Sequence, residues 1–223
     1  MDALTATMQE MNINWFIVAQ VLGIITICFE FASYQIKDKA RYFLVNGIGT
    51  LFWALMFVAI GFATGLHTQI TLIIVAVTGT IRNFIFFGTF YVNTAKSREI
   101  GLNCLIVVMI IGITSGIYTV LQMPTQVMWL HALGLVAALM FVLGQYMPGV
   151  HAVRITVVIY AIMVILTQTP INIGVFADGT VYEGFRWNIM GIAIEMAKIS
   201  SVIVFYLRFS KQEQKPRLSL RQP

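Results

Sequence analysis

Charged residues are scarce in this chain. Asp, Glu, Lys and Arg make up 10% of its 223 residues, whereas hydrophobic residues make up 59%. A soluble domain is about a quarter charged, so this composition excludes an ordinary soluble protein and a separate soluble domain. It indicates an integral membrane protein whose chain lies mostly in membrane spans. We therefore interpret the net charge of +5 as a topology signal, and we expect no nucleic-acid partner.

Cysteine, histidine and proline are also sparse, with two, three and five copies. Cys28 and Cys104 both fall in apolar segments, where a disulfide or a metal pair is not expected. The histidines show no metal-ligand spacing. The chain contains no Gly-x-Ser-x-Gly, His-Glu-x-x-His or phosphate-loop motif, and these are the motifs that would point to hydrolase or nucleotide chemistry. The sequence thus predicts no enzyme, no metal site and no cofactor.

Long apolar segments are what the chain does contain. Seven of them are long enough to cross about 30 Å of hydrocarbon as a helix. The first 14 residues carry no Lys or Arg, so we expect no cleaved signal peptide. We expect one all-α integral membrane domain over residues 1–209 and a basic cytoplasmic tail over residues 210–223. The seven segments are 14–34, 42–63, 69–92, 100–121, 127–146, 151–168 and 184–208.

Positive charge alternates between the boundaries of these segments. Lys and Arg follow the first, third, fifth and seventh segments, while the other boundaries carry only Arg186. Cytoplasmic loops are enriched in Lys and Arg, so we expect the N-terminus outside and the C-terminus in the cytoplasm. The residues that carry this signal are Lys37, Lys39, Arg41, Lys96, Arg98, Arg154, Arg208, Lys211, Lys215, Arg217 and Arg221.

Short internal matches indicate a repeat. Residues 20–23 align with 131–134, and residues 80–82 align with 197–198. One linking helix between two odd-numbered units leaves both units in the same orientation, which is a parallel repeat. We therefore expect a 3+1+3 arrangement with units at 14–92 and 127–209 and a linker helix at 100–121.

Four charged residues lie within the apolar segments at least four residues from the nearest segment end: Glu30, Arg82, Glu195 and Lys198. A charge at the bilayer centre costs roughly 2.5–3.5 kcal/mol on insertion scales, so such residues should pair or line a polar cavity. Glu195 and Lys198 are three residues apart and can pair within one helix. Arg82 then needs Glu30 or a ligand anion. Because Arg82 and Lys198 occupy equivalent positions in the repeat, we expect two cations to flank one site.

Polar residues recur at helical spacing on several segments, which predicts stripes that face one another across a central cleft. Asn46, Thr50 and Trp53 form one stripe. The others contain Gln20, Gly23 and Glu30; Thr71, Thr78, Arg82 and Thr89; and Asn188, Glu195 and Lys198. The candidate substrate-binding residues are Arg82, Lys198, Glu195, Glu30, Asn83, Asn188 and Trp53.

Structural roles are the alternative for the four charged candidates and for Trp53. Glu195 and Lys198 would be a staple within their helix, and Arg82 would clamp two helices together. Glu30 would extend toward the cytoplasmic headgroups. Trp53 would pack in the core or in an interfacial belt.

The chain resembles the YgjV family of bacterial inner-membrane proteins. The resemblance rests on Trp15, on residues 19–23, on residues 78–83 (Thr-Gly-Thr-Ile-Arg-Asn) and on residues 206–209 (Tyr-Leu-Arg-Phe). The predicted layout is also similar to the SWEET, PQ-loop and PnuC superfamily, which includes carriers of sugars, amino acids and vitamin precursors, and the KDEL receptors. The chain lacks the Pro-Gln dipeptide, and its prolines 124, 148 and 170 lie at segment ends. The proline hinges of the SWEET group therefore do not carry over.

These observations predict an inner-membrane carrier that moves a small polar or anionic metabolite by alternating access. The metabolite would be a vitamin precursor, a nucleoside, a sugar or an amino-acid-like molecule. Arg82 and Lys198 would hold it, and Glu30 and Glu195 would neutralise these cations in the empty site. The lipid bilayer is the other expected partner, and a homo-oligomer stays open. A receptor or assembly protein and a lipid-handling protein are the alternatives.

Overall fold

The chain is all-helical in the computed structural model, which describes residues 2–92, 94–122, 125–146, 150–173 and 189–213. These ranges hold seven helices and no strand. Counting described residues only, five helices are long and apolar enough to cross a membrane, and two contain shorter apolar stretches, Ala132–Tyr146 and His151–Leu166. The predicted all-α class is confirmed. The helices are α1 (Asp2–Ser33), α2 (Lys39–Thr64), α3 (Leu66–Val92), α4 (Ala95–Gln122), α5 (Thr125–Tyr146), α6 (Val150–Ile173) and α7 (Ile189–Glu213).

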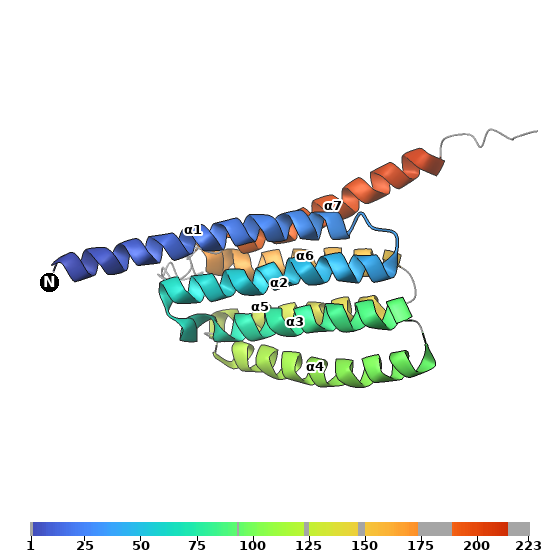
Figure 1. Cartoon of the computed structure of the whole chain (residues 1–223), viewed down its shortest axis with the longest axis horizontal. Coiled ribbons are helices and arrows are strands. Elements are labelled where there is room, and N and C mark those ends of the chain that lie inside the picture. The colour runs from blue at the N-terminus through green and yellow to red at the C-terminus, as the bar shows by residue number, and fades with distance from the viewer. Residues whose placement is uncertain (1, 93, 123–124, 147–149, 174–188, 214–223) are drawn as a thin grey trace, which may run out of the picture.

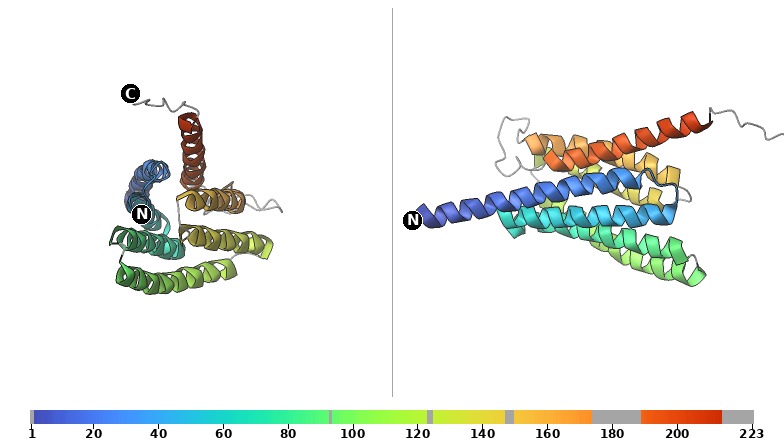
Figure 2. Two further views of the ribbon diagram at one scale, coloured as in Figure 1. Left: turned by 90° about the vertical axis from the view of Figure 1, so that its right-hand side faces the viewer. Right: turned by 45° about the horizontal axis from the view of Figure 1, so that its top comes forward.

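The helices form a ring in chain order. Each helix packs against the next one along the chain, and α7 returns to pack against α1, as Figure 2 shows from two directions. Successive helices run in opposite directions, so α1, α3, α5 and α7 all end on the same side of the bundle (Figure 1). We call this side the basic end, because it holds Lys37, Lys39, Arg41, Lys96, Arg98 and Arg154.

Local capping sets the helix boundaries. The Asp38 carboxylate accepts a hydrogen bond from the backbone N–H of Arg41 at 2.7 Å and so caps α2. At the other end of α2, Gly65 has a φ of 106°, a conformation that favours glycine. Before α4, Thr94 and Ser97 each accept a hydrogen bond at 3.1 Å from the other's backbone N–H. The chain thus reverses over a few residues and α3 begins at Leu66.

Some of the gaps expected between apolar segments are shorter in the structure. The gap expected at residues 94–99, between the third and fourth segments, is wrong, because α4 begins at Ala95 and includes Lys96 and Arg98. The expected break at 169–183 is wrong in its first part, because α6 continues to Ile173. The predicted tail from residue 210 is helical as far as Glu213. Hydropathy marks the apolar span, whereas a helix continues through polar residues that also favour helix.

Two apolar clusters enclose a polar layer. Along α2, for example, Tyr42 and Phe43 belong to one cluster, Asn46 and Thr50 are polar and buried, and Ala54 belongs to the other cluster. The same order holds in α3 and α7. The polar layer is thus shielded by packed side chains toward both ends of the bundle. Its buried members include Glu30, Asn46, Thr50, Thr80, Asn83, Glu195 and Lys198.

Glycines bring α2 close to its two neighbours. A Cβ on Gly49 would lie 3.0 Å from the Cβ of Phe29 in α1, and a Cβ on Gly47 would lie 3.3 Å from the Cβ of Asn83 in α3. Small residues allow such close approach of membrane helices. Because Asn46 flanks these glycines, the close approach brings its amide within hydrogen-bond reach of both α1 and α3.

Candidate functional site

A chain of buried hydrogen bonds links three helices in the polar layer. The Asn83 Nδ2 of α3 donates to Asn46 Oδ1 of α2 at 2.8 Å, and the Asn46 Nδ2 donates to Glu30 Oε2 of α1 at 2.9 Å. Asn83 Nδ2 also lies 3.3 Å from Thr50 Oγ1. Glu30 is 2% exposed, so its carboxylate is held inside the bundle and does not extend to the membrane surface.

The predicted ion pair on α7 is confirmed. Lys198 Nζ lies 2.7 Å from Glu195 Oε1, and both side chains are buried. The ammonium also lies 5.4 Å from the ring centroid of Tyr160 and 5.9 Å from that of Trp53. These aromatic faces contribute to holding the cation in place.

Arg82 differs from Lys198 because it has no carboxylate partner among the described residues. Of the two partners expected for Arg82, Glu30 or a ligand anion, Glu30 forms no ion pair with it. The guanidinium carbon lies 5.8 Å from the Phe141 ring centroid, and the buried Nε has no hydrogen-bond partner among the described residues. A cation inside an apolar helix bundle without a counter-charge is costly. Glu30 hydrogen-bonds Asn46 instead, because α2 lies between α1 and α3 in the ring.

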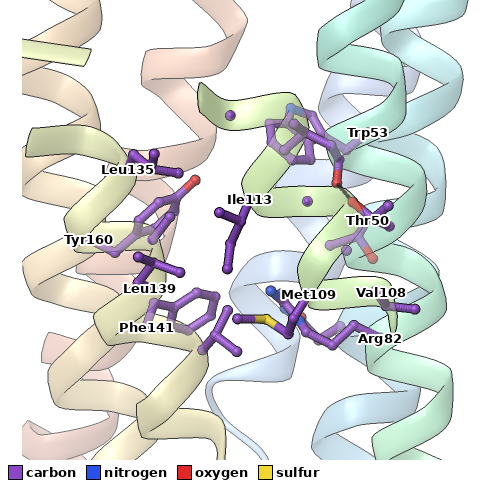
Figure 3. Close-up of a pocket in the computed structure, with 18 of the residues that line it drawn as sticks. Thr50, Trp53, Arg82, Val108, Met109, Ile113, Leu135, Leu139, Phe141 and Tyr160 are labelled. Carbon is purple, nitrogen blue, oxygen red and sulfur yellow. Dashed lines mark hydrogen bonds between the residues drawn. The ribbon is translucent and has the colours of Figure 1, made fainter. Parts of the chain in front are cut away.

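A central cavity of about 180 Å³ opens beside these residues, and all seven helices line it. Its walls differ in chemistry (Figure 3). Helices α1, α2, α3, α6 and α7, with Tyr34 of the α1–α2 connection, supply Glu30, Tyr34, Asn46, Thr50, Trp53, Val75, Thr78, Gly79, Arg82, Tyr160 and Lys198. Helices α4 and α5 supply apolar residues and glycine: Val108, Met109, Gly112, Ile113, Gly116, Leu135, Ala138, Leu139, Phe141 and Val142.

The predicted site residues occupy different places. Arg82, Lys198, Glu30 and Trp53 line the cavity. The other described candidates lie behind its wall: Glu195 pairs with Lys198, and Asn83 supports Asn46. The predicted α2 stripe is borne out, since Asn46, Thr50 and Trp53 all line the cavity. Asn188 lies outside the described residues.

Sequence reasoning missed the aromatic and apolar walls. Tyr160 and Phe141 stand in apolar segments without any polar spacing, and nothing in the sequence separates them from core residues. Their rings are stacked, with centroids 5.4 Å apart. One approaches Lys198 and the other approaches Arg82. This aromatic pair thus contacts both cations of the cavity.

The sequence predicts for Arg154 only a role in orienting the chain in the membrane, and this prediction is incomplete. It is 1% exposed, and its Nε and Nη2 donate to the backbone carbonyls of Tyr34 at 3.0 Å and Ile36 at 2.8 Å. Its guanidinium carbon lies 3.5 Å from the Phe205 ring centroid. The available signal was position, because Arg154 falls inside the sixth apolar segment and not between segments. Arg154 of α6 thus holds the α1–α2 connection against α6 by hydrogen bonds, and it packs on Phe205 of α7.

Comparison of the chain with protein-family models, with curated proteins and with solved structures finds no match.

Proposed function

We propose that the chain is a membrane carrier that moves a small anionic metabolite through the central cavity by alternating access. The observation that carries the proposal is Arg82, a cation that lines a cavity in the bundle interior and has no carboxylate partner among the described residues. An Arg guanidinium binds carboxylate or phosphate oxygens in a bidentate manner. A ligand anion would therefore supply the missing counter-charge.

The membrane arrangement is part of this proposal. All seven helices would cross a bacterial inner membrane, with the basic end in the cytoplasm as the positive-inside rule requires. The two three-helix units, α1–α3 and α5–α7, would move relative to each other about α4. The resemblance of residues 78–83 to the YgjV family of bacterial inner-membrane proteins supports the choice of this membrane. The same stretch contains Gly79 and Arg82, which line the cavity.

The two walls narrow the substrate chemistry. Arg82, Lys198 and the Asn46 amide face one side of the cavity, and the α4 and α5 side chains that line it offer no hydrogen-bonding group. A carboxylate with a compact apolar or aromatic body satisfies both sides, because a more polar body would lose hydrogen bonds to water against α4 and α5. Glu30 would accept a substrate amine or a coupled proton on the polar side.

Replacing Arg82 with alanine tests the role of this cation. A panel of small carboxylates, phosphates, nucleosides, sugars and amino acids is first screened for thermal stabilisation of the purified protein, and uptake of the best ligand is then measured in proteoliposomes. We expect Arg82→Ala to lower uptake roughly 10- to 100-fold, the equivalent of one charge-assisted contact. Arg41→Ala, an exposed arginine on α2, is the matched control and keeps wild-type uptake. Unchanged transport in Arg82→Ala excludes the proposed role, and binding without uptake supports the receptor alternative.

Filling the cavity tests whether it is the route. A Cβ added at Gly79 or at Gly88 meets no heavy atom within 4 Å, but of these two α3 positions only Gly79 lines the cavity. We expect Gly79→Leu to abolish uptake while leaving the unfolding temperature unchanged or higher, since leucine also favours helix over glycine. Gly88→Leu should transport normally. Equal uptake by both variants would show that the substrate does not pass through this cavity.

A further inference from the structure

A second cavity lies at the basic end of the bundle, away from the central one. Its volume is about 400 Å³, and it is bordered by the first residues of α2 and α4 and the last residues of α3 and α5. No residue of this cavity lines the central cavity. The lining residues are Lys39, Phe86, Thr89, Phe90, Arg98, Gly101, Leu102, Leu105 and Tyr146.

The chemistry of this basic cavity favours an anion beside apolar groups. Lys39 and Arg98 supply two positive charges, and no Asp or Glu is among the described residues that line the cavity. Lys39 Nζ lies 4.4 Å from the Phe90 ring centroid, which fixes the ammonium at the wall. Phe86 and Leu105 are each 4% exposed and form the apolar base. A ligand that fits must carry negative charge at one end and apolar groups at the other.

Its surroundings identify the class of ligand. The cavity lies where apolar helices end, which is the level of lipid headgroups in a membrane of the proposed orientation. Leu102 and Ile106, one turn apart on α4, are 43% and 50% exposed and continue the apolar surface from the cavity toward the bilayer centre. Tyr146 is 44% exposed, so its hydroxyl is available to a headgroup. Basic pockets between membrane helices bind anionic headgroups.

We propose that this basic cavity binds the phosphate group of an anionic phospholipid, with an acyl chain running along Leu102 and Ile106. Lys39 and Arg98 hold the phosphate from α2 and α4, and the lipid bridges the ends of four helices. The proposal does not depend on transport through the central cavity, and each can fail without the other.

Lipid retention by the purified full-length protein tests the site. Delipidated protein in a non-ionic detergent is mixed with phosphatidylglycerol or with phosphatidylcholine of the same acyl chains, and bound lipid is counted by native mass spectrometry. We expect tight binding of one phosphatidylglycerol. The double variant Lys39→Gln/Arg98→Gln should weaken it roughly 30-fold, from two lost charges near the membrane surface. Arg41→Gln/Lys96→Gln removes the same charge from exposed positions on the same two helices and should weaken it less than roughly threefold.

Three outcomes overturn the proposal. Equal losses in the two double variants would show general surface attraction without a site. Equal retention of phosphatidylcholine would remove the requirement for an anionic headgroup. Displacement of the lipid by inorganic phosphate at a similar concentration would assign the cavity to a soluble phosphate compound. If the double variant does not fold, the single variant Arg98→Gln is used, since this side chain is exposed. It should weaken phosphatidylglycerol binding roughly fivefold. Unchanged binding by this single variant would also overturn the proposal.

Discussion

Replacing Arg154 with alanine is expected to destabilise the fold by about 3–5 kcal/mol, a larger effect than for any other arginine in the described chain. Two hydrogen bonds from a charged donor to buried carbonyls contribute roughly 1.5–3 kcal/mol each. The guanidinium also packs on the Phe205 ring, and that contact is lost as well. For a chain of this length such a loss lowers the unfolding temperature by roughly 10 °C. Thermal unfolding of the detergent-solubilised protein measures it.

The effect should be large because the carbonyls of Tyr34 and Ile36 belong to the α1–α2 connection and receive these bonds from a helix more than 100 residues away in sequence. Next to them, Gln35 Nε2 donates to the Ser201 carbonyl of α7 at 2.6 Å. Without Arg154, this connection would keep its hydrogen bond to α7 but would lose the two hydrogen bonds from α6.

Two controls separate the loss of the Arg154 hydrogen bonds and ring contact from a simple loss of charge. Arg41→Ala removes an exposed arginine at the same end and should change the unfolding temperature by less than about 2 °C, as surface substitutions do. Arg154→Lys keeps the charge but has one ammonium in place of a planar fork, so it should restore only part of the stability. An Arg154→Ala variant as stable as the wild type would contradict this stabilising role of Arg154.

Removing one partner of the Glu195–Lys198 ion pair is expected to lower the free energy of unfolding by about 3–5 kcal/mol. Lys198→Met leaves the Glu195 carboxylate buried without its partner, and removing one member of a buried pair has this typical cost. The double variant Glu195→Leu/Lys198→Met replaces the pair by apolar side chains and should recover most of the stability, because it also removes the desolvation cost of both charges. Unfolding temperatures of the wild type, the two single variants and the double variant complete the cycle.

The double variant also decides between the two roles that the sequence leaves open. If the pair is a structural staple, the double variant is stable and transports normally. If Lys198 holds the substrate, the double variant is stable and uptake falls, because the ammonium that lines the cavity is missing. Stability of Lys198→Met equal to that of the wild type would contradict the buried pair itself.

The sequence predicts the polar layer well because helical spacing is a local property. Asn46, Thr50 and Trp53 share a face at any arrangement of the neighbours, and the structure places all three on the cavity. The Glu195–Lys198 pair is equally local, since residues three apart on one helix are always within reach. Helix ends are less predictable, because the Thr94–Ser97 cap starts α4 before the apolar run begins.

Contacts between helices are a different matter. Spacing along a helix carries no information on which helix lies opposite, so the sequence leaves either Glu30 or a ligand anion as the partner of Arg82. In the structure its guanidinium lies beside the Phe141 ring. The partners of Arg154 are backbone carbonyls, which every residue possesses and no pattern can mark.

The scarcity of charge determines by itself that this chain is a bundle of apolar helices with a few polar residues turned inward. Its basic residues alternate from boundary to boundary, and so the sequence also determines that they gather at one end. Only the tertiary structure decides which buried charges meet across helices, because such pairing depends on which helices are neighbours in the ring. It leaves Arg82 without a carboxylate partner among the described residues, beside a cavity with one polar and one apolar wall, since the α4 and α5 side chains that complete that cavity carry no polar pattern of their own.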